Sequence, residues 1–132
     1  MGRLGVKAVL LDTHAWAWAL TDDDRLSQRA RSAITGADTV LVSPITFFEI
    51  GQKVRLGKWP QMEPFVQRLP ALLETQGGAT ADLDGPICIT AATMPWSHRD
   101  PFDRLLAATA LRRNLPIVSA DGVFDAVVTR VW

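Results

Sequence analysis

Residues 6–12, VKAVLLD, form an aliphatic stretch that ends on an aspartate, and THAWAWAL follows directly at residues 13–20. The first stretch is rich in β-branched and aliphatic residues, which predicts a buried strand, and residues 16–20 predict a short helix. The same succession of a buried strand and a helix recurs along the chain. This alternation predicts an α/β fold of the Rossmann-like kind, in which helices flank both faces of a parallel sheet.

The remaining segments fit this plan. Ser43 and Pro44 predict the start of a helix, because serine caps free amide groups and proline fits the first turn. Asp100 and Pro101 predict a second start of the same kind. The other expected elements are helices over residues 26–35, 44–56, 62–76, 87–92 and 101–114, and strands over residues 39–43, 79–84, 116–121 and 127–132. Since no linker or repeat separates them, we expect residues 1–132 to form a single domain.

The composition restricts the class of protein. The chain has 132 residues, of which 48% are hydrophobic and 21% are charged, as in an ordinary globular domain. No stretch is apolar enough to span a membrane and no signal-peptide cleavage site follows the N-terminus, so we expect a cytoplasmic protein. The one cysteine, Cys88, excludes an internal disulfide and a thiolate metal cluster, and its apolar neighbours favour a place in the core. The formal net charge of zero means that any basic surface is local.

Four carboxylates fall where expected strands end or expected helices begin. Asp12 and Asp121 end strands, Glu49 lies in the second turn of a helix, and Asp103 lies in a first turn. Sites in open parallel sheets form beyond the carboxyl ends of the strands, so we expect these acids to converge there. Converging carboxylates repel one another unless a cation neutralises them, and oxygen ligands without clustered histidine favour Mg²⁺ or Mn²⁺. Such a cluster suits hydrolysis of phosphodiester bonds by activated water.

Each acid also has a structural alternative that involves only its neighbours in the sequence. Asp12 would cap the helix that starts near Thr13, Glu49 would pair with Lys53, Asp103 would favour the helix dipole, and Asp121 before Gly122 would be a turn residue. For any one acid, the two interpretations remain open. The joint placement of all four at one edge of the sheet favours the functional interpretation.

Other residues near this edge support the same hypothesis. The hydroxyls of Thr13 and Ser119 are candidates to orient a carboxylate or a bound water, with a cap and an ordinary strand residue as the alternatives. We expect Asp100 to be a helix cap, and we place His14 and His98 outside the catalytic set. Candidates for phosphate contacts are Arg104 first, and then Arg99, Arg55 and Lys53. The aromatic residues near the site are expected to lie mostly in the core, with one or two left for an apolar groove: Trp16, Trp18, Phe47 and Phe48.

Four segments resemble a known family. They are LLDTHAWAWAL (residues 10–20), SPITFFEIGQKVRLGKW (43–59), HRDPFDRLLAATAL (98–111) and IVSADGVF (117–124), and they are similar to PIN-domain proteins, in particular to VapC-like toxins of bacterial toxin–antitoxin pairs. The resemblance runs from about Val6 to Trp132. It implies a PIN-like fold and an endoribonuclease that depends on Mg²⁺ or Mn²⁺, with Asp12, Glu49, Asp103 and Asp121 as the catalytic acids and metal ligands. It also implies a homodimer and a small antitoxin protein as partner.

Three other classes of protein are alternatives to this hypothesis. A phosphoacceptor signalling domain needs a second acid beside Asp12 and a lysine after residues 116–121, and neither is present. An aspartyl phosphatase needs an aspartate where His14 stands. A non-catalytic protein-binding α/β domain remains an alternative. Within the nuclease hypothesis, Asp12, Asp103 and Asp121 are expected to bind metal directly, and Glu49 through water or on a second ion.

Overall fold

The computed structural model describes residues 7–132, so Val6, the first residue of the first expected strand, lies outside the described residues. A five-stranded, wholly parallel sheet has the order β3-β2-β1-β4-β5. The strands are β1 (Ala8–Leu11), β2 (Thr39–Val42), β3 (Ala79–Thr80), β4 (Ile117–Val118) and β5 (Arg130–Val131). The last three are shorter than expected, but the predicted parallel sheet is confirmed.

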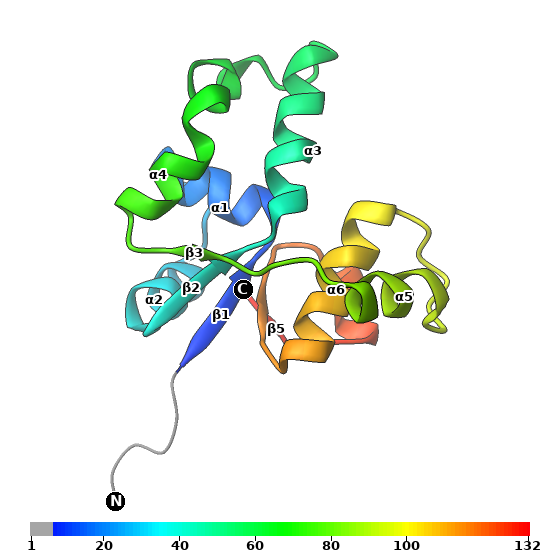
Figure 1. Cartoon of the computed structure of the whole chain (residues 1–132). Helices are drawn as coiled ribbons and strands as arrows, with labels where there is room; N and C mark the ends of the chain where they lie inside the picture. The colour runs from blue at the N-terminus through cyan, green and yellow to red at the C-terminus, as the bar shows by residue number, and fades with distance from the viewer. Residues whose placement is uncertain (1–6) are drawn as a thin grey trace, which may run out of the picture.

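Helices fill the connections between the strands (Figure 1). They are α1 (Thr13–Leu20), α2 (Gln28–Gly36), α3 (Pro44–Arg55), α4 (Leu69–Thr75), α5 (Gly85–Thr93) and α6 (Pro101–Arg113), with two 3₁₀ helices, η1 (Pro60–Arg68) and η2 (Gly122–Ala126). Ser43 caps α3 as predicted, and its side chain accepts a hydrogen bond from the amide of Ile45 at 3.2 Å. No helix within residues 7–132 combines the length and apolar character needed to cross a membrane.

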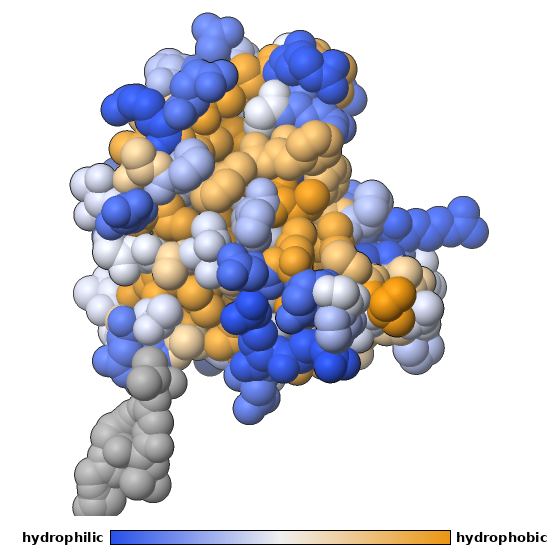
Figure 2. All heavy atoms as spheres, in the orientation of Figure 1, coloured by the Kyte–Doolittle hydropathy of each residue, from blue (hydrophilic) through white to orange (hydrophobic). Residues whose placement is uncertain are grey.

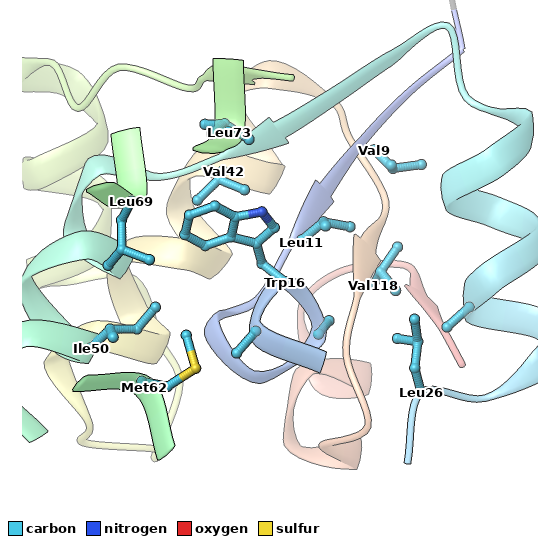
Figure 3. Close-up of a cluster of buried hydrophobic side chains, with 13 residues drawn as sticks. Val9, Leu11, Trp16, Leu26, Val42, Ile50, Met62, Leu69, Leu73 and Val118 are labelled. Carbon is cyan, nitrogen blue, oxygen red and sulfur yellow. The ribbon is translucent and has the colours of Figure 1, made fainter. Parts of the chain in front are cut away.

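Alternate residues of the central strand face two separate cores. Val9 and Leu11 of β1 pack in the cluster covered by α1 to α4, whereas Leu10 packs in the cluster covered by α6 and η2. The predicted helices on both faces are thereby confirmed. Trp16 lies at the centre of the first cluster, surrounded by aliphatic side chains (Figure 3), and its indole donates a hydrogen bond to Oε1 of Gln76 at 3.0 Å. A buried indole with its N–H satisfied fixes α1 against the sheet.

The segment over residues 62–76 differs from the expected continuous helix. It is split into η1 and α4, with Pro64 inside η1 and Pro70 in the first turn of α4. A proline has no amide hydrogen and its ring crowds the preceding turn, so an α-helix cannot run through both positions. The expectation of one helix was wrong for this reason.

Cys88 also lies where it was not expected. Helix α5 packs through Ile87 and Ala91 against Ala108 of α6, whereas Cys88 is exposed. Residues four apart share one face of a helix, and the next residue turns away from it. The apolar composition around Cys88 therefore predicted burial for a side chain that the helical phase directs to solvent.

The order of the strands places a topological switch point between β1 and β4. From β1 the chain passes to β2 and β3 on one side, and later to β4 and β5 on the other side. Open α/β sheets bind ligands at such a switch point, outside the carboxyl ends of the strands. Asp12 lies there directly, because its amide donates to the carbonyl of Val118 at 3.0 Å.

Candidate active site

Asp12 occupies the switch point between β1 and β4. Its Oδ1 accepts a hydrogen bond from the amide of Ala15 at 2.8 Å, so Asp12 is also the cap of α1. Asp12 is thus a helix cap, and this role does not exclude a role in binding a metal ion. A carboxylate has two oxygens, each of which accepts more than one bond, so a capping aspartate retains the capacity to bind a cation.

Burial at this point raises the pKa of Asp12 from 3.8 to about 6. Desolvation is the largest cause, and the nearby negative charges of Asp103 and Glu49 raise the pKa further. The Ser119 hydroxyl and the amide of Ala15 act in the opposite direction and lower the pKa in part. Three acids that were predicted to converge therefore act on one another electrostatically.

Glu49 is held on α3 by residues from two elements. Thr13 of α1 donates a hydrogen bond from Oγ1 to Oε1 of Glu49 at 2.6 Å, and Lys53 Nζ lies 3.1 Å from Oε2. Thr13 is buried and also contacts Thr46, with 3.2 Å between the hydroxyl oxygens. The ion pair with Lys53 confirms the structural alternative, but the Glu49 side chain is only 13% exposed and is not a free surface acid.

Thr46 was not identified from the sequence. It lies three residues before Glu49, which places both on one face of α3. The spacing of three residues between Thr46 and Glu49 could have indicated that Thr46 lies near the candidate acid. The hydroxyl of Thr13, in contrast, contacts a candidate carboxylate as predicted.

Asp103 lies at the start of α6 and is engaged by His98. His98 Nε2 is 2.7 Å from Oδ2 of Asp103, and the amide of Asp103 donates to Oδ1 of Asp100 at 3.0 Å. Asp100 is therefore the helix cap that was expected. Burial raises the pKa of Asp103 and the hydrogen bond from His98 lowers it, while the charges of Asp100 and Glu49 raise it. His98, which was placed outside the catalytic set, is in direct contact with a candidate acid.

Asp121 stands apart from the other three acids. It is exposed, it caps η2 by accepting a hydrogen bond from the amide of Val123 at 3.0 Å, and its own amide donates to Ser119 Oγ at 3.0 Å. The charges that raise the pKa of Asp12 come from Asp103 and Glu49. Asp121 follows β4, the strand next to β1, and so lies on the rim of the same edge.

The residues present fit a hard divalent cation by donor type and by charge. Within residues 7–132, no three acidic, histidine or cysteine side chains are close enough together to enclose one metal ion. Mg²⁺ does not need such a group, because it is bound by one or two carboxylates and keeps several waters. The crowded negative charge that raises the pKa of Asp12 and Asp103 is what a cation would relieve.

A comparison with known families agrees with this arrangement. The family model described as the PIN domain matches residues 9–129. The chain belongs to the PIN-domain family. It is 32% identical over 114 residues to "Ribonuclease VapC22" of Mycobacterium tuberculosis (strain ATCC 25618 / H37Rv), which covers 86% of each chain. The resemblance found in the sequence is thus confirmed.

Solved structures share the fold of this PIN domain. A toxin–antitoxin complex from Klebsiella pneumoniae has a TM-score of 0.66 at 16% identity and covers 94% of this chain and 96% of that one. FitAcB from Neisseria gonorrhoeae has a TM-score of 0.63 at 22% identity and covers 92% and 95%. At these identities, the likeness concerns the fold alone.

Arg104 of the PIN domain does not have the predicted role. Its guanidinium donates to the carbonyls of Ala91 (2.7 Å), Met94 (2.7 Å), Trp96 (2.7 Å) and His98 (2.8 Å). Four of the five N–H groups of an arginine are used in this way, so the fork is not available to a phosphate. The prediction of a phosphate contact was wrong, because the convergence of these carbonyls in the loop before α6 is not visible in the sequence. Arg104 instead holds the loop that carries His98.

The other basic and aromatic candidates are divided between the interior and the surface. Lys53 is bound to Glu49, whereas Arg55 and Arg99 are exposed. Trp16 is buried as expected, but Phe48 is 58% exposed and its ring centroid lies 6.1 Å from that of Phe102 on α6. Figure 2 shows apolar residues gathered over α3 on the face that also carries α6. Of the four aromatic residues predicted near the site, Phe48 is the one that is exposed.

Proposed function

We propose that the chain is an endoribonuclease that depends on Mg²⁺ or Mn²⁺ and acts as the toxin of a toxin–antitoxin pair. The observation that carries the proposal is Asp12, a half-buried carboxylate at the switch point of the sheet, whose pKa is raised by desolvation and by the charges of Asp103 and Glu49. Membership of the PIN-domain family and the identity with a protein named as a ribonuclease support the same activity.

In this proposal, Asp12, Asp103 and Asp121 are the direct metal ligands, and Glu49 acts through water or on a second ion. A cation held by these residues would supply Lewis acidity to the phosphoryl group and would lower the pKa of a bound water. The neighbouring residues fix the ligands. Thr13 orients Glu49, and His98 holds one oxygen of Asp103. Residues that fix the ligands in this way affect metal affinity almost as strongly as the ligands do.

The proposed partners are an RNA substrate, a cognate antitoxin protein and a second copy of the chain, and the proposed location is the cytoplasm. The structural neighbour from Klebsiella pneumoniae is itself a toxin–antitoxin complex, which supports the antitoxin. The exposed ring of Phe48 beside Phe102 offers an apolar anchor of the kind that protein interfaces use.

The test is incubation of the purified protein with a structured RNA and Mg²⁺, repeated with Asp103→Asn. We expect the wild type to leave a 5′ phosphate and a 3′ hydroxyl, and the variant to leave the RNA intact. Equal cleavage by both proteins would identify a contaminating nuclease. Absence of both cleavage and Mn²⁺ binding would favour the alternative, a non-catalytic protein-binding domain.

A further inference from the structure

A pocket of about 280 Å³ opens beside the acid site, between α1, the end of α3 and η1. Three rings, His14, Trp18 and Trp59, and three basic side chains, Arg25, Lys53 and Lys58, line most of it. None of the residues that line it is acidic, in a chain whose formal net charge is zero. The pocket is therefore a local basic surface, which the net charge of zero does not reveal.

The three rings form a continuous aromatic wall. The His14 ring is stacked on Trp59, with 4.7 Å between the centroids and 26° between the planes, and it lies 5.6 Å from the Trp18 ring. A planar base can extend an aromatic stack of this kind at its outer face without its sequence being read. A volume near the lower end of the range for ligand pockets suits one nucleotide and is too small for a folded segment.

The basic groups are placed along the same wall. Lys53 Nζ lies 5.6 Å from the centroid of the Trp59 ring, and the Arg25 guanidinium lies 5.0 Å from that of Trp18. Arg25 is engaged by Asp23 through two hydrogen bonds, from Nε to Oδ1 at 3.0 Å and from Nη2 to Oδ2 at 2.8 Å. Lys58 forms no ion pair with any residue of the described range 7–132. At least one cation is thus available to a phosphate.

Two residues connect the pocket to the candidate acids. Lys53 lines the pocket and also lies 3.1 Å from Glu49 Oε2. His14 lines it too, and follows Thr13, whose hydroxyl donates to Glu49. A strand of RNA whose scissile phosphate is at the acids would place a flanking nucleotide over this wall.

We propose that this pocket binds one nucleotide of single-stranded RNA next to the cleaved bond, with the base stacked on the Trp59–His14 wall and the phosphate on Lys58. The inference rests on the proposed ribonuclease function and adds a substrate subsite to it. Stacking platforms combined with a basic groove are the usual means of binding single strands without sequence preference. The basic lining matches the negative charge of a phosphate backbone, which favours RNA over an apolar protein segment.

The test is the affinity of a fluorescein-labelled single-stranded RNA for the full chain, measured by anisotropy in EDTA, where metal-dependent cleavage is absent. We expect Trp59→Leu to weaken binding about tenfold, and Trp59→Phe to retain most of it, because only the latter keeps a π face. We expect Lys58→Ala to weaken binding severalfold and to reduce the slope of log K against log salt by about one. Arg112→Ala, exposed in the last turn of α6, is the matched control and should change neither quantity.

Thermal unfolding of each variant separates a binding defect from a folding defect, and Lys58→Ala, at an exposed position, carries the test if Trp59→Leu unfolds. Equal RNA affinity of Lys58→Ala, Trp59→Leu and the wild type, with the same salt slope, would overturn the inference and would favour a protein partner for the pocket. Cleavage of RNA by the wild type in Mn²⁺ is measured separately. Its absence would overturn the proposed function itself, whatever the binding data show.

Discussion

The hydroxyl of Thr13 donates a hydrogen bond to Oε1 of Glu49 at 2.6 Å, and so joins the first residue of α1 to the second turn of α3. Thr13 directly follows Asp12, the acid at the switch point of the sheet. One short contact therefore relates two candidate acids that are far apart in the sequence. This hydrogen bond gives Thr13 the role of positioning the Glu49 carboxylate, and the role can be tested by substitution.

Thr13→Val should lower RNA cleavage by about 10- to 100-fold, the usual effect of removing a group that orients a metal ligand. Valine keeps the volume of the buried side chain but cannot donate to Glu49. Thr13→Ser restores the hydroxyl and should recover most of the activity, measured as initial rates at several Mn²⁺ concentrations. A purely structural role would instead lower the unfolding temperature of Thr13→Val without changing the Mn²⁺ dependence of the rate.

Asp12→Asn should stabilise the metal-free protein. The folded state holds the proton of Asp12 more tightly than the unfolded chain does, since the pKa rises from 3.8 to about 6. Ionisation therefore disfavours folding from about pH 4 upward, with a cost of about 3 kcal/mol at neutral pH. Asparagine keeps the helix cap without the charge, so we expect a gain of about 1–3 kcal/mol in the free energy of unfolding at pH 7.

The pH dependence is the control for this prediction. At about pH 4 the folded state has taken up the proton of Asp12 and the unfolded state has begun to take it up as well, so most of the difference in stability between the two proteins is lost. Urea unfolding of both proteins at pH 7 and pH 4, in EDTA, measures the difference. A gain that is the same at both pH values, or a loss at pH 7, would show that the carboxylate is not strained by burial.

Mn²⁺ should raise the unfolding temperature of the wild type and have little effect on Asp12→Asn. A ligand that binds only the folded state stabilises it by about 2.7 kcal/mol at a concentration 100 times Kd. Scanning calorimetry with and without Mn²⁺ compares the two proteins, and Asp38→Asn, an exposed acid before β2, serves as the charge-matched control. Equal shifts in all three proteins would assign the effect to some other site.

Arg104→Lys should destabilise the fold by about 2–4 kcal/mol, because one ammonium cannot replace a guanidinium that satisfies four carbonyls. Arg99→Lys, at an exposed position in the same loop, should change the free energy of unfolding little. Chemical denaturation measures both. A stable Arg104→Lys variant that has lost affinity for RNA would instead indicate that Arg104 contacts a phosphate.

The sequence predicts what depends on local pattern. Three local patterns place three of the four acids in the correct elements. The aliphatic stretch places Asp12 at the end of β1, the Ser43–Pro44 start places Glu49 on α3, and the Asp100–Pro101 start places Asp103 on α6. These features persist because caps and buried strands are decided by neighbours in the chain. The parallel arrangement then follows from the alternation of strands and helices.

What the sequence does not predict depends on contacts between distant residues or on helical phase. The carbonyls that engage Arg104 come from Ala91 of α5 and from the segment after that helix, and the path of this segment is set by tertiary packing. The contact of His98 with Asp103 depends on the same loop. Cys88 is exposed because it is one position away from the buried face of α5, which composition alone cannot reveal.

In the proposed function, the acids at the switch point cleave RNA with a divalent cation. The most direct test compares the initial rates at which the wild type and Asp12→Asn cleave a labelled RNA in Mn²⁺. Asp12→Asn is expected to fold at least as stably as the wild type, so its rate reports chemistry alone. We predict a rate lower by about a thousandfold or more, which corresponds to several kcal/mol of lost transition-state stabilisation. A folded Asp12→Asn variant whose rate is within a fewfold of the wild type would contradict the account.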